Sequence, residues 1–111
     1  MKNSTNDLWD SVIWLLKECK VKSRLKLKEE SEWTGWSEWL TSPVPSCVEN
    51  QSYGPVEKKR VDMIEISVHR TTRSGRLLPE KKVDLSDELI EKLKLKGVLF
   101  SMSEHSLLIK L

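Results

Sequence analysis

Apolar residues recur at helical spacing near the start of the chain, over residues 7–20. Steps of three and four residues bring them onto one face of a helix. The members of this face are Leu8, Trp9, Val12, Ile13, Leu15, Leu16 and Cys19. The pattern predicts an amphipathic helix with Trp9 in the core and Trp14 nearer the margin of the buried face. Thr5 or Asn6 can cap its first turn.

Two later stretches alternate between apolar and polar residues, as strands with one buried face do. Residues 21–28 alternate strictly, and residues 59–72 repeat the pattern over a longer stretch. Arg73–Gly75 supplies turn residues, so residues 76–83 are expected to return as a hairpin partner. Pro79 marks that returning strand as an edge.

A second helix is predicted over residues 84–96, with Leu85, Leu89, Ile90 and Leu93 on its buried face. Asp84 or Ser86 is the expected cap, and Gly97 ends the helix.

Two apolar segments close the chain, at residues 98–102 and 107–111. They flank a polar turn and predict a terminal hairpin that is central in its sheet or covered. The predicted elements together favour a single α+β domain over residues 1–111, with two helices packed on a mostly antiparallel sheet in two layers.

The middle of the chain carries a different pattern. Trp33, Trp36 and Trp39 are spaced by three residues, and the stretch from Thr41 to Pro55 is rich in proline. Prolines at alternate positions are excluded from central strands and helix interiors, so this stretch is expected to be an irregular surface segment or an edge. Two interpretations of the tryptophans stay open. They form a lid on the core, or they form a surface that binds a partner.

Composition adds compartment and chemistry to this picture. The chain has 111 residues with 19 Lys and Arg against 17 Asp and Glu, which gives a net charge of +2. The N-terminal residues are polar, no long apolar run occurs, and the two cysteines do not form a metal-binding or redox spacing. We therefore expect a cytoplasmic protein with reduced thiols, no signal peptide and no membrane span.

No catalytic or metal-binding motif is found. His69 and His105 are isolated in sequence, Cys19 falls on the apolar helix face, and nothing marks Cys47 as activated. We expect no enzyme activity, no metal and no cofactor.

A basic stripe on the first predicted strand supports an alternative function. Lys22, Arg24, Lys26 and Lys28 share one face at a spacing that suits a phosphate backbone, and the nearby tryptophans could stack on bases. The competing explanation is a solvated strand face that discourages edge aggregation, and the three glutamates that follow favour it.

The spacing of the three tryptophans is similar to that in thrombospondin type 1 repeats, whose tryptophans stack with arginines between strands. Those repeats also need several disulfides, whereas this chain has two cysteines.

A broader resemblance covers most of the chain. It rests on Asp7-Leu8-Trp9, the strand bearing Arg24, Gly35-Trp36, and Tyr53-Gly54 ahead of residues 62–66. On these features the chain resembles small bacterial immunity proteins encoded beside contact-dependent or polymorphic toxins, and also an uncharacterised family of small bacterial domains. The first resemblance implies a protein that is monomeric when free and that neutralises a cognate toxin domain, often a nuclease, by one-to-one binding.

The expected partner surface combines aromatic and acidic residues of the middle segment. Its members are Trp33, Trp36, Trp39, Glu30, Glu32, Glu38 and Tyr53. Inhibitors of nucleases are usually acidic, and this chain departs from that pattern. A third hypothesis is an oligomerisation domain that uses residues 107–111 as an open edge.

Overall fold

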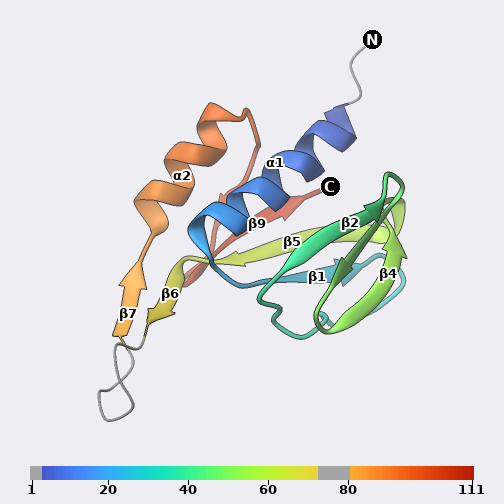
Figure 1. The fold of residues 1–111 in the computed structure, drawn as a ribbon, viewed down its shortest axis with the longest axis horizontal. Helices are drawn as coiled ribbons and strands as arrows, with labels where there is room; N and C mark the ends of the chain where they lie inside the picture. Colours follow the sequence, from blue (N-terminus) through green and yellow to red (C-terminus); the bar gives the residue numbers. More distant parts are fainter. Residues whose placement is uncertain (1–3, 73–80) are drawn as a thin grey trace.

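The computed structural model describes residues 4–72 and 81–111 (Figure 1). Helix α1 (Ser4–Cys19) confirms the first predicted helix, and Lys20 follows it in a left-handed conformation with φ 55°. Trp9 is fully buried and Trp14 is 39% exposed, as the apolar stripe predicts. The expected capping residues Thr5 and Asn6 have side chains outside the described part of the structure.

The main sheet has four strands in the order β1-β5-β9-β8, and every neighbouring pair is antiparallel. They are β1 (Ser23–Leu27), β5 (Val61–Ser67), β9 (Ser106–Lys110) and β8 (Ser101–Met102). The register sets Leu25 beside Ile64 and Ile64 beside Ile109. This register brings the apolar residues of three strands onto one face.

Both helices contribute to a single core on that apolar face. Helix α2 (Ser86–Leu95) buries Leu89 and Leu93, which join the buried residues of α1 and of the sheet in one cluster. The α+β class with a mostly antiparallel sheet is thus confirmed. No helix in the described residues is long and apolar enough to cross a membrane.

The proline-rich stretch is more regular than predicted. It forms a second sheet from β2 (Leu40–Val44), β3 (Cys47–Asn50) and β4 (Tyr53–Glu57) in the order β2-β3-β4. The prediction of an irregular segment is therefore wrong, while the expected edge character is right. Pro43 and Pro55 lie in the two outer strands, where a missing N–H can face away from the ladder, and the central strand has none.

The long strand predicted over residues 59–72 is broken in two. A 3-10 turn (Lys58–Arg60) precedes β5, and β6 (His69–Thr72) leaves the main sheet to pair with β7 (Lys81–Asp84). At the break, the Ser67 hydroxyl donates to the His69 carbonyl and accepts from the His69 N–H. The pairing of β6 with β7 confirms the hairpin, but its predicted turn at residues 73–75 and Pro79 lie outside the described residues.

Helix α2 begins two residues later than predicted, and its N-cap is Leu85 rather than Asp84 or Ser86. Asp84 precedes the helix, and its carboxylate accepts hydrogen bonds from the N–H and the hydroxyl of Ser86. Gly97 follows the helix with a φ of 72°. In the terminal hairpin β9 is central and β8 is the outer strand, so Leu107 and Leu108 are not an open edge.

Candidate functional site

Residues 33–37, which carry Trp33 and Trp36, run antiparallel along the outer edge of β1. Ser23 and Ser37 exchange two backbone hydrogen bonds of 3.0 and 2.8 Å, and the N–H of Thr34 donates to the carbonyl of Leu25 at 2.8 Å. Residues 33–37 therefore extend the main sheet beyond β1. This placement directs the Trp33 and Trp36 side chains toward Arg24.

Arg24 is held between two indole rings. Its guanidinium carbon lies 4.9 Å from the centre of the Trp33 ring and 4.7 Å from that of Trp36. Its Nε also donates to Glu65 on the neighbouring strand at 2.6 Å, and the other Glu65 oxygen accepts from the Ser106 hydroxyl at 2.6 Å. The cation is thus paired within the protein, and the two indoles are fixed relative to the sheet.

Buried polar side chains hold the same segment from the side of the second sheet. The fully buried Ser37 hydroxyl donates to the Trp39 carbonyl at 2.6 Å and accepts from the Gln51 N–H at 2.7 Å. The Gln51 side chain in turn accepts from the Glu38 N–H at 3.0 Å. The backbone that carries Trp36 and Trp39 is therefore tied to β1 and to the β3–β4 turn.

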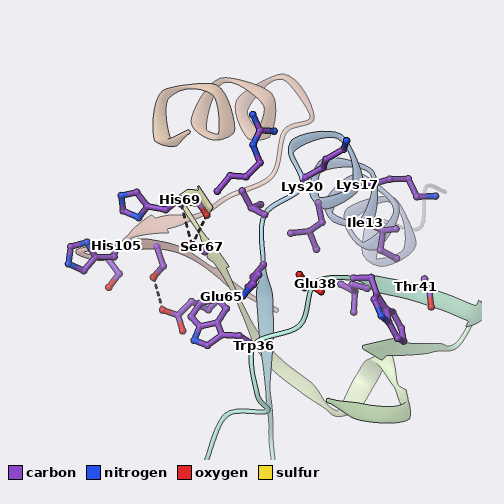
Figure 2. Close-up of a pocket in the computed structure, with 18 of the residues that line it drawn as sticks. Ile13, Lys17, Lys20, Trp36, Glu38, Thr41, Glu65, Ser67, His69 and His105 are labelled. Carbon is purple, nitrogen blue, oxygen red and sulfur yellow. Dashed lines mark hydrogen bonds between the residues drawn. The ribbon is translucent and has the colours of Figure 1, made fainter. Parts of the chain in front are cut away.

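A groove of about 1000 Å³ opens beside this segment (Figure 2). Its walls come from the last turns of α1, the start of β1, residues 36–41, the β5–β6 break and the β8–β9 turn. Trp36 and Trp39 stand at the groove and are 41% and 43% exposed. Figure 2 shows Trp36 beside Glu65, with the His69 and His105 side chains near each other.

The groove is unevenly charged. Lys17, Lys20 and Lys22 lie on the wall formed by the end of α1 and the link to β1. None of the three forms an ion pair with another residue of the described part of the chain. Arg70 lies on the same lining and donates to the Cys19 carbonyl at 3.1 Å. Glu38, Glu65 and Glu104 are lining carboxylates as well, and Glu65 is paired with Arg24.

The predicted partner surface is only partly assembled. Trp36, Glu38 and Trp39 line the groove together, whereas Trp33 contacts Arg24, as Trp36 does, but does not line the groove. The other predicted members are exposed but do not line the groove: Glu30, Glu32 and Tyr53. None of the three tryptophans is buried: Trp33 is half-buried, and Trp36 and Trp39 are exposed, so the three do not form a closed lid on the core.

The basic stripe is divided by intramolecular contacts. Lys22 and Lys28 are exposed, whereas Arg24 is paired with Glu65, and the Lys26 ammonium donates to the Glu30 carbonyl at 2.9 Å.

The thiols differ in environment. Burial, together with the hydrogen bond that the thiol donates to the Glu88 carboxylate, raises the pKa of the Cys19 thiol to about 11. Cys47 is half-buried on β3. In the described residues no cluster of three or more histidine, cysteine or acidic side chains is placed to hold a metal ion.

Comparison with known proteins gives one family. Residues 6–110 match a family of unknown function, DUF6678, which covers nearly the whole chain. The chain belongs to this family. The match agrees with the resemblance to an uncharacterised family of small domains, and it carries no functional description. Searches of curated proteins and of solved structures each found no significant match.

Three features of this DUF6678 protein were not predicted from its sequence. They are the Arg24–Glu65–Ser106 network, the approach of the His69 and His105 rings to 5.9 Å, and the groove. Each depends on the register between strands that are distant in sequence. The alternation of β1 and of β5 did signal that Arg24 and Glu65 both face away from the core.

Proposed function

We propose that the chain is a non-catalytic inhibitor of the immunity type, which neutralises a cognate bacterial toxin domain in the cytoplasm by one-to-one binding through the groove. The observation that carries the proposal is the pair of half-exposed tryptophans at the groove, Trp36 and Trp39, whose backbone is held by hydrogen bonds to the Ser37 side chain and to β1.

The physical argument is one of preorganisation. Tryptophan is enriched among the residues that dominate binding energy at protein interfaces. Ordering flexible side chains on association costs free energy, and this cost falls when the side chains are already fixed. Here Trp36 is stacked on Arg24, and the backbone of Trp39 is held by Ser37. The resemblance to immunity proteins supports a toxin domain as the partner.

The test is co-expression with the toxin domain encoded by the neighbouring gene. The wild-type chain is expected to co-purify with that domain and to protect cells from it, and Trp36→Ala combined with Trp39→Ala is expected to abolish both. Trp14→Ala is a matched control, because Trp14 is 39% exposed but lies against Lys92 of α2 and Lys96 just after that helix. No complex and no protection by the wild-type chain would refute the proposal.

Nucleic-acid binding is the second candidate. It is favoured by the exposed Lys22 and Lys28, which flank β1 at its two ends, and by the half-exposed ring of Trp36. It requires tryptophan fluorescence to be quenched by single-stranded oligonucleotides at low salt, with affinity that falls steeply as salt is added. Absence of quenching removes this candidate.

A further inference from the structure

We propose that the groove binds an extended acidic segment of the partner protein, with carboxylates facing the lysine wall and an apolar side chain packed on the tryptophans. The lysine wall consists of Lys17, Lys20 and Lys22. This inference rests on the proposed function and specifies the chemistry of the surface that the inhibitor recognises.

Charge is the first support. The three ammonium groups are exposed, lie within six positions along the chain at the junction of α1 and β1, and have no ion-pair partner among the residues the structure describes. Because all three lysines line the same groove, a partner segment that carries several carboxylates can meet more than one of them at once.

The arrangement of the remaining lining favours a peptide over a nucleic acid. Apolar side chains of Ile13, Leu16 and Leu40 contribute to the lining together with Trp36 and Trp39. The regularly spaced phosphates of a nucleic acid strand would also meet Glu38 and Glu104, which line the same groove. A peptide can place carboxylates against the lysines and apolar or neutral residues elsewhere.

The chemistry of the lysine wall also bears on the identity of the toxin. A nuclease presents a basic cleft to its nucleic acid substrate, and an inhibitor that plugs it needs acidic residues. A lysine-lined groove is complementary to an acidic surface instead. The groove therefore favours a contact outside such a cleft, or a toxin domain with a different activity.

The experiment measures fluorescence anisotropy of a labelled peptide of alternating Glu and Leu residues, titrated with the wild-type chain at low salt. Counterparts with Gln or Lys in place of Glu, and an oligo-dT of the same net charge, serve as comparison probes. We expect the Glu peptide to bind most tightly. The combined variant Lys17→Gln, Lys20→Gln, Lys22→Gln should weaken it by at least about tenfold.

A control variant removes the same charge elsewhere. Lys59→Gln, Lys94→Gln and Lys110→Gln alter exposed lysines that do not line the groove, and this variant is expected to bind the Glu peptide nearly as the wild-type chain does. Equal weakening by both triple variants, tighter binding of the Lys or Gln peptide, or a preference for oligo-dT would overturn the inference. Circular dichroism checks that both variants are folded.

The two proposals can fail separately. If the toxin domain co-purifies equally well with the lysine-wall variant, the inhibitor function stands and the acidic-segment inference falls. If the Glu peptide binds through the lysine wall while no toxin domain binds or is neutralised, the groove chemistry stands and the immunity function falls.

Discussion

Arg24 shows how a charged side chain can be structural on an otherwise open sheet face. Its planar guanidinium makes cation–π contacts with two indole rings and an ion pair with the Glu65 carboxylate. Lysine carries the same charge but cannot stack as a plane while it donates sideways to Glu65.

We expect Arg24→Lys to lower the free energy of unfolding by about 1–2 kcal/mol through loss of the stack and of a charge-assisted hydrogen bond. The near-ultraviolet circular dichroism of the tryptophans should weaken with it. Lys28→Arg, at an exposed lysine just past the C-terminal end of β1, is the control. Unchanged stability and spectrum in Arg24→Lys would show that the stack is incidental.

Cys19 and Cys47 provide a second test at the scale of single residues. With a pKa of about 11, Cys19 at pH 8 is ionised in about one molecule in a thousand, and the thiolate is the reactive form. We expect iodoacetamide to modify Cys47 first in the folded chain and both thiols after denaturation. Mass spectrometry of the wild-type chain and of Cys47→Ser measures this. Comparable modification of Cys19 in the folded Cys47→Ser chain would contradict the expectation.

At the scale of elements, the N-terminus of α2 depends on a carboxylate. Hydrogen bonds from the hydroxyl and the N–H of Ser86 lower the pKa of Asp84 below its usual value of 3.8. A lowered folded-state pKa stabilises the fold above pH 3.8, and this contribution is lost as the pH falls below that value.

Asp84→Ala is therefore expected to lower the melting temperature at pH 7, by less and less as the pH falls below 3.8. Asp84→Asn keeps an acceptor for Ser86 and should lose less at neutral pH. Thermal unfolding followed by circular dichroism across pH makes the comparison. A melting-temperature difference that is independent of pH would count against a stabilising role of the ionised Asp84 carboxylate.

The two tryptophans of α1 test how that helix is anchored. Trp9→Ala should cost about 3–5 kcal/mol because it empties a fully buried site, whereas Trp14→Ala should cost well under half of that. Denaturant unfolding gives both values. Similar losses would mean that the buried face of α1 is assigned wrongly.

Elements with a clear period were predictable, and those that depend on partners were not. The helical spacing of apolar residues in α1 and the apolar–polar alternation in β1 indicate the buried face of each element from its own sequence. The second sheet was missed because Pro43 and Pro55 suggest an interruption, and their position in outer strands becomes visible only once the strand order is known.

At the scale of the whole molecule, the α+β class follows from the order of the periodic segments. The candidate site does not, since it lies where α1, residues 36–41, β5–β6 and the β8–β9 turn converge. Sequence pattern signalled Trp36, Glu38 and Trp39. It also grouped Glu30, Glu32 and Tyr53 with them, and these three residues are exposed but do not line the groove.

The placement of residues 33–37 along β1 has a consequence for solubility. An uncovered strand edge invites pairing with another chain, and here the segment that carries the tryptophans occupies the backbone groups of Ser23 and Leu25 that would do so. Any change that detaches this segment, such as Ser37→Pro, would therefore expose a template for aggregation while it disorganises the groove. Loss of recognition and loss of solubility should then appear together in the same variants.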